Sequence, residues 1–262
     1  MEFTDWLDLI FFGGFALFIL LDFVAPARRF RKQRAWRTRG LLAFVLYMAI
    51  ALTAPFLWDD LLAAHRLVDL TALPFAAQLG IAFFAAEIFI YAWHRALHQV
   101  PFLWRIHQTH HSVERIDVYG AFYHHPLGVF AWALNGSLGL VWAVGVRPEA
   151  ALIVGTAIGF FTYFQHANVK TPRWLGWITQ RPEMHAAHHE RGRHTDNFCD
   201  LPIIDKLFGT YRNPPTWEGE AGFHDGASAQ LVDLMLLRDV SGQAADRSEG
   251  EPSRPSMEPL GA

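Results

Sequence analysis

Residues 74–111 read PFAAQLGIAFFAAEIFIYAWHRALHQVPFLWRIHQTHH, and this stretch decides the fold. Its first part, Pro74 to Trp93, is apolar over the length that a helix needs to cross the hydrocarbon core of a bilayer. Pro74 suits the first position of such a helix. Histidines follow directly after the apolar run. Because Pro101 breaks the helix, the later histidines are predicted to lie on a second short helix that folds back beside the first.

Most of the 14 histidines of the chain fall into three short arrays. Residues three and four apart lie on one face of a helix, so each array can direct two or three imidazoles at one point. Neutral imidazole is the commonest metal-binding side chain. The three arrays therefore predict a metal site. Together with one histidine after a later apolar stretch, they comprise His94, His98, His107, His110, His111, His166, His185, His188 and His189.

Composition indicates a membrane protein. The chain is 52% hydrophobic and 15% aromatic, above the usual apolar share of a soluble domain. Its net charge of −3 gives no whole-chain electrostatic case for binding nucleic acid. The lone cysteine, Cys199, excludes an internal disulfide framework.

Two further apolar runs precede this stretch, and an apolar hairpin follows it. Trp6 to Val24 and Leu41 to Trp58 are each long enough to be a membrane span. The hairpin arms, Leu127 to Val146 and Glu149 to Phe164, either cross the bilayer or dip into it. The predicted fold class is all-α: a polytopic membrane helical bundle with a cytoplasmic helical cap that carries a poly-histidine di-metal site.

The loop between the first two spans carries the densest basic run of the chain, Arg28 to Arg39. By the positive-inside rule this loop faces the cytoplasm, and the histidine arrays then fall on the same side. This predicts a multi-pass integral membrane protein with its active site on the cytoplasmic face. We expect N-terminal spans and the basic loop at 1–72, a catalytic domain at 73–224, and a largely disordered C-terminal tail at 225–262, with a short helical piece near 231–237.

Glu87 lies inside the third span and shares a helix face with Tyr91, His94 and His98. An acidic residue within a span is costly and usually points at a partner or a cavity. Glu87 is therefore either an acceptor beneath the metals or a substrate contact, or else a hydrogen-bonded structural carboxyl. Nine imidazoles are too many for one metal, which implies two ions. Imidazole suits iron, zinc and copper alike, so ligand type alone does not identify the metal.

The histidine pattern resembles the fatty acid hydroxylase and sterol desaturase superfamily of membrane di-iron enzymes. The likeness covers roughly Glu87 to Tyr211. Its longer signatures are Tyr91-Ala-Trp-His94-Arg95-x-x-His98, His124-His125-Pro126-Leu127, Gln165-His166-Ala167-Asn168, and Asn197-Phe198 leading to Asp205-Lys206-Leu207-Phe208-Gly209-Thr210-Tyr211.

This resemblance implies that the nine histidines bind two iron ions. Glu87 and Asn168 are candidate catalytic residues, with Asn168 either orienting a metal-bound water or capping the following turn. The chain departs from the family pattern at Cys199, where glycine is common, and at Thr162, where some relatives carry a further histidine. Ordinary surface positions are expected for His65 and His224. The remaining histidines, which stand outside the arrays, are weaker candidates as ligands or ligand partners: His124, His125 and His194.

The implied activity is oxygen-dependent hydroxylation or desaturation of a C–H bond in a membrane lipid. The substrates would be the lipid and O2. The chain contains no dinucleotide fingerprint, cysteine cluster or haem-attachment motif, so electrons must come from an external donor such as a ferredoxin, a cytochrome or a reductase. A non-catalytic metal-binding or metal-transport protein is the alternative, but its ionisable residues would be spread through the membrane depth. A b-type haem protein would use only a few of these histidines.

Overall fold

The computed structural model describes residues 2–242, and the secondary-structure elements of this part of the chain are all helices or helical turns, apart from one isolated bridge between Glu190 and Ala221. The prediction of an all-α fold is confirmed. The long helices are α1 (Phe3–Val24), α2 (Trp36–Thr53), α4 (Phe75–Gln99), α6 (Pro126–Ser137) and α7 (Pro148–His166). The short ones are α3 (Asp59–Ala64), α5 (Pro101–His111), α8 (Pro182–His188), α9 (Pro202–Leu207) and α10 (Leu231–Met235). Single turns lie at η1 (Ala54–Leu57), η2 (Val118–Gly120), η4 (Arg173–Trp177) and η5 (Ala227–Ala229), and η3 (Leu138–Ala143) is a π-helical turn that extends α6.

Four helical stretches are long and apolar enough to cross a membrane: Phe3–Val24, Trp36–Leu57, Phe75–Gln99 and Pro126–Ala143. They correspond to the three predicted spans and the first arm of the predicted hairpin. The protein is a multi-pass membrane protein. Outward side chains of α2 such as Leu42 and Val45 are more than 60% exposed, as expected for a surface that faces lipid rather than water.

Proline begins the helices that build the site. Pro101, Pro126, Pro148, Pro182 and Pro202 each stand at the first position of a helix. At this position the missing N–H costs nothing and the fixed φ angle suits the helix. In α5 and α8 this proline sets where the histidine array lies along the helix.

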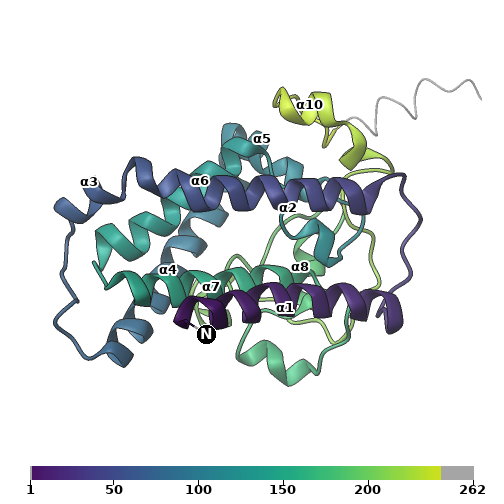
Figure 1. Ribbon diagram of the computed structural model, residues 1–262. Helices are drawn as coiled ribbons and strands as arrows, with labels where there is room; N and C mark the ends of the chain where they lie inside the picture. Colours follow the sequence, from purple (N-terminus) through teal and green to yellow (C-terminus); the bar gives the residue numbers. More distant parts are fainter. Residues whose placement is uncertain (1, 243–262) are drawn as a thin grey trace, which may run out of the picture.

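The bundle is held by contacts of α7 with α1 and α4 and of α2 with α6 (Figure 1). Aromatic rings fill the centre between α1, α2 and α7. Phe15 stacks on Phe44 with ring centroids 4.5 Å apart, and the Tyr163 hydroxyl donates to the Phe11 carbonyl at 3.1 Å. The connector from α1 to α2 lies at one end of the molecule and α3 lies at the other.

The cap that follows α7 is organised by a fully buried guanidinium. Arg181 pairs with Glu183 at 3.0 Å and donates to the Asn213 side-chain oxygen at 2.8 Å. A buried charge is tolerated only when it is paired and hydrogen-bonded. Arg181 thereby fixes the start of α8, which carries the last histidine array.

Part of the tail expected at 225–262 belongs to the residues that the structure describes. Residues 225–242 are folded and contain α10, near the predicted helical piece. Gln108 on α5 holds this segment, because its side chain donates to the Arg238 carbonyl at 2.7 Å and accepts from the Val240 amide at 3.1 Å. The remaining part of that prediction, 243–262, lies outside the described residues.

Candidate metal centre

The nine array and hairpin-end histidines lie in two compact groups. In each group, one nitrogen per residue lies within 4.8 Å of the corresponding nitrogen of every other member. The first group contains His94, His98, His107, His111 and His188, and the second contains His110, His166, His185 and His189. We call them the five-histidine group and the four-histidine group.

Each H-x-x-H-H array is shared between the two groups in reciprocal fashion. On α5, His107 and His111 belong to the five-histidine group and His110 to the other. At α8, His185 and His189 belong to the four-histidine group and His188 to the five-histidine group. At about 100° per residue, positions i and i+4 point in similar directions while i+3 points elsewhere. One short helix can therefore supply ligands to two neighbouring centres.

The two groups are adjacent. The rings of His111 and His189, one from each group, stack with centroids 4.1 Å apart. Within the five-histidine group, the Nε2 atom of His107 lies 3.1 Å from the Nε2 atoms of both His94 and His111. Within the four-histidine group, the Nε2 atom of His185 lies 3.1 Å from those of His166 and His189. Nitrogens bound at about 2.1 Å to one ion would have similar spacing.

Hydrogen bonds fix the tautomer of four of these imidazoles. The Nδ1 atoms of His94, His98 and His188 donate to the carbonyl oxygens of Phe198 (2.9 Å), His194 (2.8 Å) and Asp196 (2.6 Å). His166 Nδ1 donates to the Thr162 carbonyl at 2.7 Å. A carbonyl can only accept, so a neutral ring bonded in this way carries no hydrogen on Nε2.

These lone pairs are available to a metal. The Nε2 atoms of His98 and His188 are buried and lack a hydrogen-bond partner among the described residues. Metal-bound histidines almost always donate their second N–H to a carbonyl or carboxylate. The donor set therefore fits two metal ions, and the histidine groups are able to bind metal.

Electrostatics favour the metal-binding form of the imidazoles outside the spans. Burial lowers the pKa of His111 and His189 well below the usual range, and the neighbouring imidazoles lower it further. The same two causes, burial first, lower the pKa of His107, His110 and His185. These rings are therefore neutral at physiological pH, which is the form that coordinates metal.

The three carbonyls that accept from His94, His98 and His188 belong to one short segment, residues 194–198. His194, Asp196 and Asn197 adopt positive φ angles of 43°, 71° and 51°. Non-glycine residues rarely occupy this region, and Asn and Asp tolerate it best. The turn aims successive carbonyls at two different helices, α4 and α8.

Side chains on several sides hold this segment in place. Asn197 donates to the Arg212 carbonyl at 2.8 Å and accepts from the Arg212 amide at 2.8 Å. Asp205 accepts from the Phe198 amide at 2.9 Å and from the Thr210 hydroxyl at 2.7 Å. Gln180 donates to the Asn197 carbonyl at 2.9 Å. Gln180 and Asp205 were not among the predicted site residues, although Asp205 begins the family signature that ends at Tyr211.

Glu87 supports the same segment from α4. It is fully buried, and its Oε2 atom accepts from the backbone amides of Asp200 (2.9 Å) and Leu201 (3.0 Å). It belongs to neither histidine group and does not line the cavity described below. Its contacts are those of a positioning residue and fit the alternative of a hydrogen-bonded structural carboxyl, while a catalytic role for Glu87 stays a prediction.

The Asn168 side chain is directed away from the histidine groups. Its amide donates to Asp22 (2.8 Å) and to the Arg28 carbonyl (2.9 Å), and its oxygen accepts from the Arg28 amide at 2.9 Å. Because these bonds use its donors and acceptor, Asn168 holds the α1–α2 connector against the end of α7. These contacts are structural, and the role of orienting a metal-bound water stays a prediction.

The weaker histidine candidates lie outside both groups, each in a different environment. His124 stacks on His110 with centroids 4.1 Å apart but belongs to neither group. His125 caps α6 by accepting from the Leu127 amide at 3.1 Å. His194 contributes its carbonyl to His98, and its Nδ1 atom lies 3.1 Å from His111 Nδ1. His65 is exposed, whereas His224 is half-buried rather than a plain surface residue.

The two departures from the family pattern are accommodated. Cys199 does not have a positive φ angle, so its backbone has no need of glycine. Burial raises the pKa of its thiol, which therefore stays protonated. Thr162 lies one turn before His166 and lines the cavity beside the four-histidine group. This group has one member fewer than its neighbour, on the side where some relatives carry a histidine.

A cavity of about 150 Å3 opens onto both groups. His94 and His107 line it from the five-histidine group, and His110, His166 and His185 from the other. The rest of its lining comes mainly from α4, α6, α7 and residues 198–200. Its larger apolar side chains include Ile90, Trp132, Ile158 and Phe198, and its polar ones include Asn135, Gln165 and Asp200. Both groups can therefore act on one molecule held in this space.

Comparison with known proteins is consistent with this site. A family model described as "Fatty acid hydroxylase" matches residues 79–210, which include all nine histidines. The ornithine lipid hydroxylase OlsE of Rhizobium tropici is 26% identical over 230 residues, covering 80% of this chain and 68% of the relative. Human alkylglycerol monooxygenase is 31% identical over 134 residues, covering 50% of this chain and 29% of the relative.

A fungal relative is similar to the same region. The sphingolipid C4-hydroxylase sur2 of Schizosaccharomyces pombe is 28% identical over 144 residues, covering 53% of this chain and 49% of the relative. The chain therefore spans about half or less of two of these three relatives. No solved structure matches the chain significantly.

Proposed function

The chain belongs to the fatty acid hydroxylase family, and on that premise we propose that it hydroxylates an aliphatic C–H bond of a membrane lipid at its two histidine groups. It is a membrane oxidoreductase, as its relatives are named hydroxylases or monooxygenases. The observation that carries the proposal is the cavity onto which both groups open.

We propose iron as the metal in each group, as the resemblance to membrane di-iron enzymes implies. Zinc has no redox chemistry, whereas hydroxylation oxidises the substrate. The five-histidine group would hold one ion and the four-histidine group the other. Two irons held there would supply the activation of dioxygen and the removal of hydrogen from an unactivated C–H bond.

The residues of the chain supply position and exclude water. Ile90, Trp132 and Ile158 form an apolar wall against which an aliphatic chain can lie beside the histidines. The segment 194–198 keeps the rings of His94, His98 and His188 oriented through its carbonyls. Preorganised ligands of this kind keep their geometry when substrate enters.

The volume of the cavity favours a linear chain as the reacting part of the substrate. At about 150 Å3 it is smaller than the pockets of roughly 300 Å3 and above that take drug-sized ligands. A stretch of acyl or alkyl chain fits a space of this size. Three of the relatives are named for ornithine lipid, alkylglycerol and sphingolipid. A polar lipid with a long chain is therefore the proposed substrate class.

Electrons come from an external carrier, a ferredoxin, a cytochrome or a reductase. The basic run from Arg28 to Arg39 supports a cytoplasmic position for the α1–α2 connector by the positive-inside rule. His111 and His189 are joined by short segments to residues beside that connector, so the metal site faces the same side.

The test is a single turnover assay with labelled oxygen. The iron-loaded protein in nanodiscs that contain long-chain polar lipids is supplied with a ferredoxin, its reductase and isotopically labelled dioxygen. Mass spectrometry of the extracted lipid should show one labelled oxygen atom per product. The His107→Ala variant is the matched control. Loss of two hydrogens without oxygen would mean desaturation, and an unchanged lipid pool with two irons bound and the carrier oxidised would contradict the proposal.

A further inference from the structure

A second cavity, of about 480 Å3, lies beside the α1–α2 connector and shares no lining residue with the metal-site cavity. Residues 29–34 of the connector form one wall, and Arg191 with segment 219–229 forms another. The connector joins two candidate membrane spans, α1 and α2. The cavity therefore lies at the end of the bundle, at the level where the headgroups of a bilayer begin.

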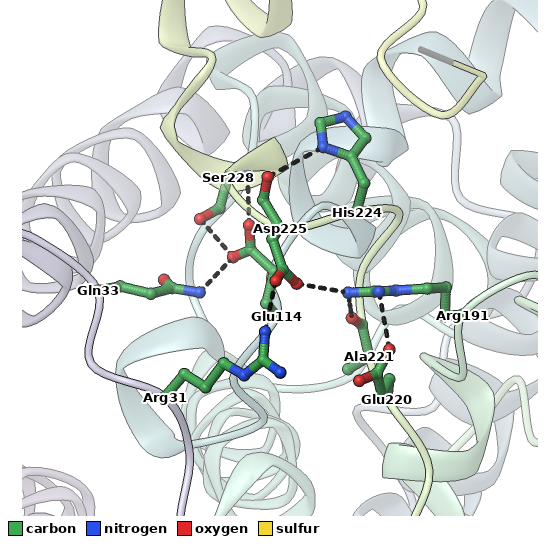
Figure 2. A network of polar contacts seen from close by, with 9 residues as sticks. All are labelled: Arg31, Gln33, Glu114, Arg191, Glu220, Ala221, His224, Asp225 and Ser228. Carbon is green, nitrogen blue, oxygen red and sulfur yellow. Dashed lines mark hydrogen bonds and ion pairs between the residues drawn. The ribbon is translucent and has the colours of Figure 1, made fainter. Parts of the chain in front are cut away.

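The lining of this cavity has an excess of positive charge. It contains seven arginine or lysine residues and three acidic ones, Glu114, Glu220 and Asp225. All three acids already have partners in the protein. Glu114 accepts from Gln33 and from the Ser228 hydroxyl, each at 2.7 Å (Figure 2).

The other two acids hold the guanidinium groups that cross between the walls. Asp225 pairs with Arg31 at 2.7 Å and with Arg191 at 3.2 Å, and Glu220 pairs with Arg191 at 2.8 Å (Figure 2). These bonds tie the connector to the segment that follows α8 and shape the cavity. They leave no acidic group of the lining for the other basic side chains, of which Arg115 pairs with Asp117 outside the lining at 2.9 Å.

Several donors of the lining remain available. Arg29, Lys32 and Arg34 are exposed, and none of them forms an ion pair within residues 2–242. The Nε atoms of Arg39 and Arg191 are buried N–H donors with no acceptor in the described chain. An unpaired buried donor costs free energy, so a ligand that accepts from it is stabilised.

We propose that this cavity binds a phosphate-bearing anion, carried by an anionic membrane lipid or present as free phosphate. Guanidinium groups pair with phosphate oxygens through two parallel hydrogen bonds, which makes arginine the preferred residue for such sites. Basic pockets beside membrane helices bind anionic headgroups in this way. This site is separate from the hydroxylation proposed above and does not depend on it.

Arg37 distinguishes a built site from a generally basic loop. It belongs to the same basic run but does not line the cavity, and its guanidinium lies 3.9 Å from the centroid of the Phe23 ring. The positive-inside rule requires only basic charge near the span ends and treats Arg37 and Arg34 alike. In a phosphate site formed by this cavity, Arg34 contributes to binding and Arg37 does not.

The experiment uses full-length, iron-loaded protein in a neutral maltoside detergent. Thermal unfolding is followed by the fluorescence of its ten tryptophans during titration with inorganic phosphate, dihexanoyl phosphatidylglycerol or dihexanoyl phosphatidylcholine, at constant ionic strength. The proteins are the wild type, the double variant Arg29→Gln/Arg34→Gln, and Arg37→Gln as the control. Iron content and the Tm without ligand verify that each variant is folded.

We expect phosphatidylglycerol to raise the Tm of the wild type and of Arg37→Gln, with an apparent Kd about tenfold weaker in the double variant. A response to phosphatidylglycerol alone assigns the site to lipid, and an equal response to inorganic phosphate assigns it to the free ion. The proposal is overturned if Arg37→Gln weakens binding as much as the double variant. It is also overturned if neither phosphatidylglycerol nor inorganic phosphate raises the Tm, or if only an acidic ferredoxin, added as a fourth probe, does so.

Discussion

The Nδ1 atom of His98 lies 2.8 Å from the backbone carbonyl oxygen of His194, although the two residues belong to α4 and to the loop after α8. The same loop supplies the carbonyls of Asp196 and Phe198 to His188 and His94. Three of the five histidines in one group are thus oriented by a single backbone turn. We therefore expect the metal content to depend more on the backbone conformation of this turn than on the side chain of Asp196.

Asp196 offers a direct test of that turn. Its φ angle is 71°, where glycine is unstrained and a β-branched residue is a rare outlier. Asp196→Gly should keep the carbonyl for His188, the metal content and the Tm, since its exposed ion pair with Arg193 contributes little. Asp196→Val should lose about 1–3 kcal/mol of stability. Calorimetry and iron analysis check both variants. Equal Tm values and equal iron contents in the two variants would show that the metal site does not depend on the conformation of this turn.

Glu87 should affect turnover without touching the substrate. Glu87→Leu leaves the amides of Asp200 and Leu201 unpaired, at about 1–3 kcal/mol for each buried donor, and should lower the Tm and the iron content. Glu87→Gln retains an acceptor oxygen, so iron should stay bound while kcat falls.

KM is the measurement that separates positioning from substrate contact. Glu87 does not line the cavity, so KM for the lipid should be unchanged in Glu87→Gln. Glu149→Gln, which removes an exposed carboxylate from α7, is the control. A rise in KM with constant kcat would show instead that Glu87 contacts the lipid.

Spacing was sufficient to select eight of the nine histidines that the structure brings together, because i, i+3 and i+4 positions share a helix face. His166 was added as the histidine that follows the apolar hairpin. Spacing did not indicate which of these histidines belong to which of the two groups. The split of each H-x-x-H-H array between two groups depends on how α5 and α8 pack against each other, which is a tertiary relationship. The carbonyl acceptors at 194, 196 and 198 could not be predicted from the sequence, because every residue has a backbone carbonyl.

Contacts far apart in the sequence account for other features that the sequence did not indicate. Asn168 was expected either to orient a metal-bound water or to cap the following turn, whereas its side-chain bonds reach back to Asp22 and Arg28. The folded segment after residue 225 depends on Gln108, more than a hundred residues earlier. The sequence of that segment, rich in small and polar residues, carries no sign of this partner.

The division into groups predicts which pairs of ligand substitutions act on one ion. His107→Ala/His188→Ala removes two members of the five-histidine group from two different helices. His188→Ala/His189→Ala removes neighbours in the sequence that belong to different groups. If each group holds one ion, iron should fall from about two per chain to about one in the first variant and toward none in the second.

Elemental analysis measures this difference, and turnover should be lost in both variants because one cavity depends on both groups. His65→Ala is the control, since His65 is exposed and belongs to neither group. Equal iron loss in the two double variants would mean that the histidines form a single interdependent cluster rather than two sites.

Gly136 tests whether the lipid occupies the cavity at all. It lines the cavity from α6, and a Cβ atom built on it meets nothing within 4 Å. Gly136→Leu should therefore fold and bind iron normally while its side chain fills part of the 150 Å3. We expect kcat/KM for the lipid to fall about tenfold or more, as a few misplaced methylene groups in an apolar pocket can do. The kcat/KM of Gly136→Ala should lie between those of the wild type and Gly136→Leu.

Gly155 provides the matched control for that substitution. It lies on α7, is exposed, and also has nothing within 4 Å of a built Cβ atom, but it does not line the cavity. Gly155→Leu adds the same side chain to a neighbouring helix and should leave kcat/KM unchanged. A loss in Gly136→Leu alone, with iron content equal in both variants, places the reacting chain beside the histidines. Full activity in Gly136→Leu would mean that the lipid approaches the metals by another route, because a leucine in this space and a bound chain cannot coexist.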